Sequence, residues 1–303
     1  MNEGSRLLAR NTRLSLRLSR SVAGIAVATI FIVLVASGTT KADSQQYSVV
    51  ARVDVKNAGL TSGELVVTVG NLSMPATAIK ASPDIPRNIA IVVDAGPDQA
   101  NVLSKEKDLA IALINDLSDG STSFTVSSVG TSPKMQAPTQ VRSVAIGYIR
   151  DIAGESGKET NVPIYDAIGL TIRQISGLPG LRVVIFIGEG NDGGSRLRYS
   201  ELRNLVESNQ IAFFAALVAN HSLRGAKSIL RYGWNLRELA SDTVGAFLEN
   251  QKAPKADRRL TECIQGLRLV AFEMPSMQAG HYRISVSVRR GKRLLAQKGL
   301  FIP

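Results

Sequence analysis

The sequence predicts an α/β protein: a doubly wound, mostly parallel sheet with helices on both faces, flanked by short β segments at both ends. The first observation is NIAIVVDAG at 88–96, an apolar run that ends in an acidic residue and a turn. Such a run indicates a strand buried on both faces of a helix-covered sheet. The second is that strand-like and helix-like stretches alternate up to about residue 250, as in parallel sheets. The third is period-two alternation before and after this region.

The segment 47–80 contains the first of these β patterns. YSVVARVDV, ELVVTV and PATAIKA each alternate or carry strand-forming residues. Three strands are few for an independent domain, so we expect this segment to pack on the part of the chain after it. SPDIPR at 82–87 is a proline-punctuated linker.

The central region alternates between the two kinds of element. Strands are expected at 88–96, 122–130, 182–190 and 211–219, helices at 103–117, 141–152, 162–175 and 199–208, and a helix followed by a short edge strand within 235–249. The tail returns to β alternation in LRLVAFEM, HYRISVSVRR and LLAQKGLFIP, with Gly291-Lys292 as a hairpin turn.

The first 42 residues have the order of a secretory signal. Five arginines against one glutamate precede an apolar stretch at 21–38, and small residues precede a possible cut after Ala42. An uncleaved anchor is the alternative, because the apolar stretch is at the lower limit for crossing a bilayer. Either reading predicts export. The expected organisation is 1–42 signal or anchor, 43–87 short β segment and linker, 88–252 α/β domain, and 253–303 C-terminal β extension.

Composition excludes several classes of function. The chain has 303 residues and a formal net charge of +11, much of which lies in the signal segment. With six Tyr, eight Phe and one Trp, no basic patch interleaved with aromatic residues is present, so nucleic acid is not an expected partner. Cys263 is the only cysteine, which excludes an internal disulfide and argues against a cysteine zinc site.

Four stretches together resemble the von Willebrand factor A-domain (vWA) family. They are the strand 88–94, PIYDAIGLTI at 163–172, VVIFIGEGNDGGS at 183–195 and LRELASDTVGAFLE at 236–249. The resemblance covers about Tyr47 to Pro303 and is greatest to the VWFA-related domain typical of acidobacterial exported proteins. It implies a doubly wound sheet and, in the metal-binding members, a magnesium site at the carboxyl ends of the strands.

The chain departs from the metal motif that the resemblance implies, which is Asp-x-Ser-x-Ser, then a threonine, then a second aspartate. Asp94 matches the first position, but Gly96 and Asp98 replace the two serines. Val162 occupies the threonine position. Thr160 lies two residues earlier and would substitute only if the loop shifted.

The surviving acids change the chemistry of this site. Glu189 stands where the second aspartate is usual, and Asp192 follows it. Magnesium prefers octahedral oxygen ligation, which the lost hydroxyls would have supported, whereas calcium accepts more carboxylates and looser geometry. We predict a degenerate site without a specific metal or other cofactor, with calcium and magnesium as the alternatives.

These observations predict an exported, non-enzymatic adhesion or scaffold module. It would bind an unidentified protein of the cell envelope or extracellular space through the loops 95–102, 154–162 and 188–198, which follow strand ends. It would meet the membrane only through an uncleaved amino-terminal segment. One alternative is a divalent-metal-dependent hydrolase that uses the clustered carboxylates. Another is a degenerate domain that only stabilises a larger envelope assembly.

Overall fold

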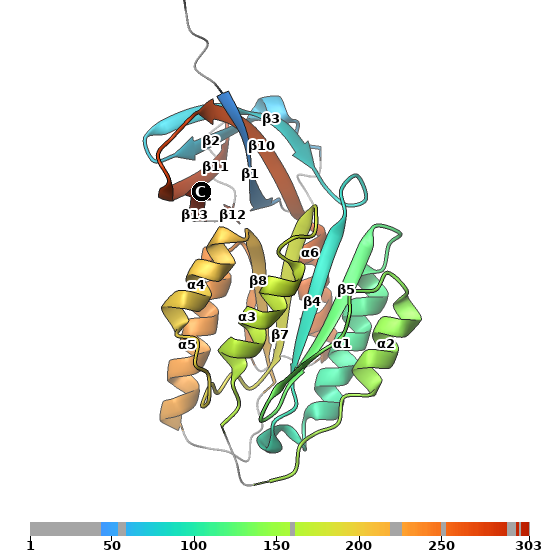
Figure 1. Ribbon diagram of the computed structural model, residues 1–303. Helices are drawn as coiled ribbons and strands as arrows, with labels where there is room; N and C mark the ends of the chain where they lie inside the picture. The colour runs from blue at the N-terminus through green and yellow to red at the C-terminus, as the bar shows by residue number, and fades with distance from the viewer. Residues whose placement is uncertain are drawn as a thin grey trace, which may run out of the picture. The chain divides into compact units, whose positions relative to one another are not determined.

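The computed structural model describes residues 44–53, 59–157, 161–218, 226–249, 253–289, 295–296 and 298–302. The predicted signal or anchor at 1–42 and the predicted Gly291-Lys292 turn lie outside these residues. Within them, the strands form one six-stranded and one seven-stranded sheet (Figure 1). Among these residues, no helix has the length and apolar character needed to cross a membrane.

The six-stranded sheet is the centre of the α/β part. Its strands are β4 (Arg87–Asp94), β5 (Thr122–Val129), β6 (Pro133–Met135), β7 (Leu181–Gly188), β8 (Ile211–Leu217) and β9 (Phe247–Glu249), in the order β6-β5-β4-β7-β8-β9. All neighbours pair in parallel except β6, which is antiparallel to β5. Every residue of β4 is buried, as its continuous apolar run indicated. The predicted mixed α/β architecture is confirmed.

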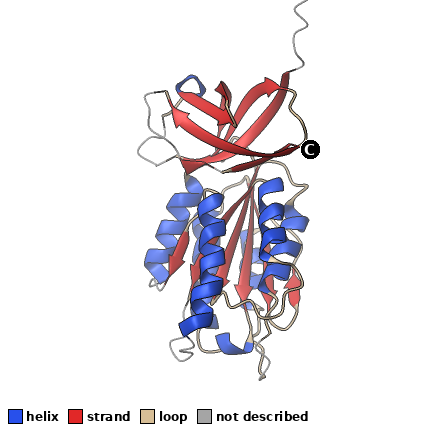
Figure 2. Ribbon diagram, turned by 90° about the vertical axis from the view of Figure 1, so that its left-hand side faces the viewer, coloured by secondary structure: helices blue, strands red, loops and turns tan. Residues whose placement is uncertain are grey.

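Six helices accompany the strands in the described part of the chain. They are α1 (Leu103–Leu117), α2 (Arg142–Arg150), α3 (Ile164–Ile175), α4 (Tyr199–Ser208), α5 (Ala226–Asp242) and α6 (Ala253–Gln265). Because side chains alternate along a strand, β4 contributes to two separate cores. Ile89, Ile91 and Val93 pack in the cluster that contains residues of α1, whereas Ala90 and Val92 belong to the cluster that contains residues of α3, α4 and α5. Figure 2 shows these helices beside the strands of the α/β part.

The two predicted β segments belong to one sheet. Its strands are β1 (Ser44–Arg52), β2 (Leu65–Val69), β3 (Leu72–Lys80), β10 (Leu267–Pro275), β11 (Gly280–Val288), β12 (Leu295–Ala296) and β13 (Gly299–Ile302), in the order β12-β1-β10-β3-β2-β11-β13. β1 pairs with β10 along its whole length, so that Val49 lies opposite Val270. The consecutive strands β12 and β13 stand at opposite ends of this order, so the tail of the chain pairs with both edges that would otherwise be open.

Helix α6 corrects the prediction that residues 253–303 form a β extension. Its buried positions Ala256, Leu260 and Ile264 recur every four residues and belong to the same core as α1, on which the helix packs. Most of the other positions are polar or charged. With so few apolar residues, the helical period does not stand out in the sequence. The β structure of the tail therefore begins only at Leu267.

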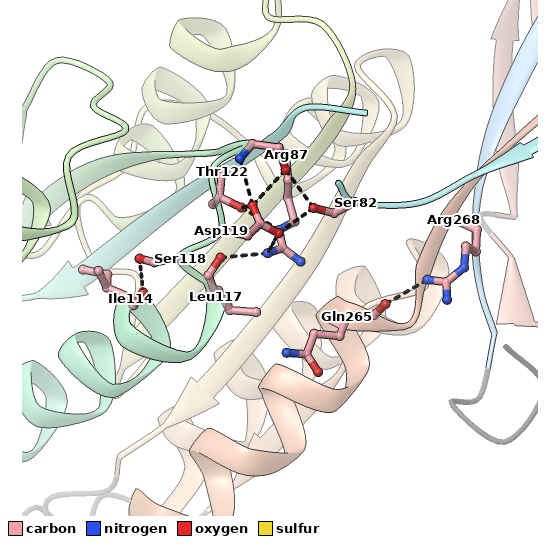
Figure 3. A network of polar contacts seen from close by, with 10 residues as sticks. Ser82, Arg87, Ile114, Leu117, Ser118, Asp119, Thr122, Gln265 and Arg268 are labelled. Atoms are coloured by element: carbon pink, nitrogen blue, oxygen red, sulfur yellow. Dashed lines mark hydrogen bonds and ion pairs between the residues drawn. The ribbon is translucent and has the colours of Figure 1, made fainter. Parts of the chain in front are cut away.

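A polar network joins the linker to the start of β4 (Figure 3). The buried Arg87 side chain donates to the carbonyl oxygen of Leu117 at 2.7 Å and forms a salt bridge with Asp119 at 3.0 Å. The Asp119 carboxylate accepts hydrogen bonds from the hydroxyls of Ser82, Ser121 and Thr122. Burial by itself would raise the pKa of Asp119, but these hydrogen bonds and the Arg87 charge outweigh it and lower that pKa.

Replacing Asp119 by asparagine should therefore destabilise the protein at neutral pH, by about 1 kcal/mol because the carboxylate is partly solvated. Because folding lowers the pKa of Asp119, its carboxylate stabilises the folded state at pH values above the ordinary pKa of 3.8. This stabilisation is lost as the pH falls through the folded-state pKa. The difference from the wild type, measured by urea unfolding, should shrink below pH 4. The matched control is Asp84→Asn, an exposed acid of the same linker. An equal effect in both variants would contradict this account.

Candidate functional site

Asp94 lies at the carboxyl end of β4, where open parallel sheets bind ligands. Its side chain is only 3% exposed, and Oδ1 accepts a hydrogen bond from the backbone N–H of Gly96 at 3.1 Å. The Asp94 carboxylate thus stabilises the loop that follows β4 and does not face solvent.

Gly96 and Val162 fill the place of the hydroxyls in the resembled motif. A Cβ added at Gly96 would lie 2.6 Å from Cγ2 of Val162 and 3.2 Å from Oδ1 of Asp94. Val162 is itself buried. The two departures from the motif are therefore complementary, since an apolar methyl group occupies the space that a side chain at 96 would need. This donor set does not fit magnesium, which requires oxygen ligands around the ion.

Glu189 follows β7 and is held by a residue that the sequence analysis did not identify. Its carboxylate accepts a hydrogen bond from Nε2 of Gln99 at 3.0 Å, and both side chains are buried. The 3-10 helix η3 (Pro97–Gln99) places Gln99 there, closed by a hydrogen bond from its N–H to the Gly96 carbonyl. Asp98 precedes Gln99, but the described structure does not include its side chain.

Glu106 is the second residue that the sequence analysis missed. It is fully buried in the first turn of α1, and among the residues that the structure describes neither carboxyl oxygen has a hydrogen-bond partner. Burial raises its pKa well above the ordinary value, and the negative charges of Asp94 and Glu189 raise it further. We call Asp94, Glu106 and Glu189 the buried acidic cluster. The signal was available in the sequence: Glu106 lies three residues after Leu103 and four before Ala110, on the apolar face of the helix.

Asp192 lies in the predicted contact loop 188–198, where its carboxylate makes capping hydrogen bonds. Its Oδ1 accepts hydrogen bonds from the backbone N–H of Tyr165, at 3.2 Å, and from the Ser195 hydroxyl. It thereby satisfies an amide in the first turn of α3, which begins after Pro163. Burial raises the pKa of Asp192 although these hydrogen bonds act to lower it. Asp192 thus caps helix α3 from a neighbouring loop. The predicted site residue Thr160 lies outside the described residues.

The site loops are fixed to one another by backbone hydrogen bonds. The N–H of Glu155 donates to the carbonyl of Ala95 at 3.0 Å, and the N–H of Gly193 donates to that of Val162 at 3.2 Å. The three predicted contact loops thus meet at the carboxyl ends of the strands. Among the described residues, no three His, Cys, Asp or Glu side chains are placed to hold a metal ion. The arrangement is a surface of hydrogen-bonded loops above enclosed carboxyl groups.

Comparison with known proteins concerns the fold alone. No protein-family model matches the chain, and no curated protein sequence matches it. The structure is similar to an aerotolerance-related membrane protein from Bacteroides fragilis, with 15% identity, 58% of this chain and 98% of that chain covered, and a TM-score of 0.46. It is also similar to BatB from Bacteroides thetaiotaomicron, with 18% identity, coverage of 58% and 96%, and a TM-score of 0.45.

A third similar structure covers more of this chain. It is a von Willebrand factor type A protein from Catenulispora acidiphila, with 10% identity, coverage of 85% of this chain and 72% of that chain, and a TM-score of 0.49. The family named for this third structure is also the one that the sequence of the α/β part resembles.

Proposed function

We propose that this protein is an exported adhesion or scaffold module whose doubly wound vWA-like domain binds another protein without a metal ion. The observation that carries the proposal is the contact between Gly96 and Val162, which fills the space of the ion-binding hydroxyls. A partner's carboxylate would thus have no metal ion to coordinate at this site. Recognition then falls to the loop surface, and the amino-terminal sequence supports export by its basic, apolar and small-residue order.

The exposed loop residues suit protein binding better than turnover. Asn101, Asn161 and Gly194 are exposed on the three loops, whereas the buried acidic cluster is enclosed beneath them. A hydrolase would need a carboxylate within reach of a substrate, and the three acids of the buried acidic cluster do not offer one. We therefore favour binding over the metal-dependent hydrolase. Calorimetry with calcium, magnesium and manganese separates the two, because the proposal expects no heat of binding from any of them.

Capture of a partner from the native envelope fraction tests the proposal. The immobilised protein should retain a partner, and EDTA should not release it. Asn101→Glu and Asn161→Glu should each weaken retention, because they place a charge in the contact surface. Thr77→Glu, an exposed change on β3, is the matched control. The proposal fails if no partner is retained, or if retention is indifferent to the two loop changes.

A second prediction tests the Gly96–Val162 contact itself. Gly96→Ser alone should cost about 1–2 kcal/mol in unfolding free energy, because the added atoms overlap Cγ2 of Val162. Adding Val162→Ala makes room for the serine, so the double variant should be more stable than the sum of the single effects predicts. Urea unfolding of the four proteins in this cycle measures the coupling, and strict additivity would contradict the contact.

A further inference from the structure

We propose that a groove along α3 and α4 binds a peptide segment that combines acidic residues with apolar anchors. This groove, the α3–α4 groove, has a volume of about 510 Å³ and is lined by Pro133, Asp166, Leu170, Arg173, Arg196, Leu197 and Glu201. A second hollow of about 360 Å³ continues it along α4 and shares Arg173, Leu197 and Glu201. The groove takes Arg196 and Leu197 from the end of the contact loop 188–198, but the proposal does not rest on the absence of a metal ion.

The floor of the groove is apolar and accessible. Leu170 on α3 is 41% exposed, and Leu197 is half-buried beside it. Gly169 allows Leu197 to lie close to α3, because a Cβ at position 169 would be 2.8 Å from Cδ2 of Leu197. On the other side, Met135 is 41% exposed and lies two residues after Pro133 in β6, hence on the same face of that strand. Exposed apolar side chains gathered along a groove are typical of a docking surface.

The acids of the groove are already engaged by the backbone. The Asp166 carboxylate accepts hydrogen bonds from the N–H groups of Arg196 and Leu197, at 3.0 and 2.8 Å. The Glu201 carboxylate accepts one from the N–H of Arg198 at 2.7 Å, as part of the cap of α4. These two carboxylates therefore have less capacity to pair with a positively charged ligand.

The arginines of the groove remain available. Arg173 and Arg196 are both exposed, and within the described part of the chain neither forms a salt bridge. A planar guanidinium pairs well with carboxylates. Two free arginines beside an apolar floor thus match a segment in which acidic residues flank apolar ones. The chain's own first 20 residues do not match the groove, because they are rich in arginine and so carry the same charge as its arginines. A nucleic acid does not match it either, because the lining carries no aromatic ring on which a base would stack.

The test is fluorescence anisotropy with the full chain and a short labelled peptide in which glutamates flank leucines. The peptide should bind, and binding should weaken as salt increases. The pair Arg173→Glu and Arg196→Glu should weaken it about tenfold or more, and Leu170→Ser should also weaken it. A second pair, Arg173→Gln and Arg196→Gln, removes the two charges without reversing them and should also weaken binding of the peptide. The matched control is the pair Arg142→Glu and Arg150→Glu, which makes the same change of charge on exposed positions of α2.

Three outcomes would overturn the proposal. One is that the wild-type chain does not bind the peptide. Another is that the α2 pair weakens binding as much as the groove pair, since binding would then depend only on net charge. The third is that vesicles of anionic phospholipid bind through Arg173 and Arg196 while the peptide does not, which would assign the groove to a membrane surface. Thermal unfolding of each variant checks that the fold is retained.

Discussion

Alanine at position 188 should destabilise the protein by about 3 kcal/mol or more. Gly188 ends β7, and its backbone lies directly against the side chain of Asp94. A Cβ added there would be 2.3 Å from Cβ of Asp94 and 2.9 Å from Cζ of Phe186. Both neighbours are buried, so neither has space to move away. The strand end and the acidic residue beside it therefore require glycine for close approach.

Urea unfolding measures this effect, with Gly147→Ala as the matched control. Gly147 lies within α2, and a Cβ added there meets no atom within 4 Å. In a helix, alanine is more favourable than glycine by about 1 kcal/mol, so the control should be stabilised. If Gly188→Ala were as stable as the wild type, the described packing of Asp94 against β7 would be wrong.

Glu106→Gln should stabilise the protein at alkaline pH and have little effect near pH 4. Folding raises the pKa of Glu106, so the folded state binds this proton more tightly than the unfolded state. The resulting stability is complete below the ordinary value of 4.5 and is lost as pH rises through the folded-state value. Glutamine has nearly the same shape and never ionises. At pH 9 the gain should be about 2 kcal/mol, since an uncompensated buried charge is costly.

Thermal unfolding of both proteins from pH 4 to pH 9 tests this expectation. The wild type should lose stability relative to Glu106→Gln as pH rises, and the difference should have the sign opposite to that of Asp119→Asn. Glu106→Asp, which keeps an ionisable carboxyl, should keep the pH dependence. A difference between wild type and Glu106→Gln that does not change with pH would show that Glu106 does not hold its proton in the folded state.

The helices and strands of the α/β part could be predicted because their signals are local. The apolar period gave the bounds of α1 and α4 as the structure has them. Helix α3 begins two residues later than expected, since Pro163 is its N-cap and not its second residue. Helix α6 was missed because its sequence is mostly polar.

The pairing of the outer strands could not be predicted from local patterns. Alternation identified both Val49 and Val270 as strand residues, but alternation does not state which strand pairs with which. The same limit applies to the site. Asp94 and Glu189 were expected at neighbouring strand ends, whereas Glu106 and Gln99 meet them only through the placement of α1 and η3. The capping contact of Asp192 could not be predicted either, because a helix-capping aspartate and a ligand aspartate look alike in sequence.

The seven-stranded sheet has a consequence for the order of assembly during synthesis. The ribosome makes β1, β2 and β3 first, but β10, β11, β12 and β13 only after the whole α/β segment. Before those four strands are made, the α/β segment already has all the strands of its own sheet. At that stage β1, β2 and β3 lack most of their neighbouring strands. Unpaired strands of this kind attract other nascent chains. The seven-stranded sheet can therefore be completed only after β13 has been translated, and products truncated before β13 should be preferred substrates for chaperones and proteases.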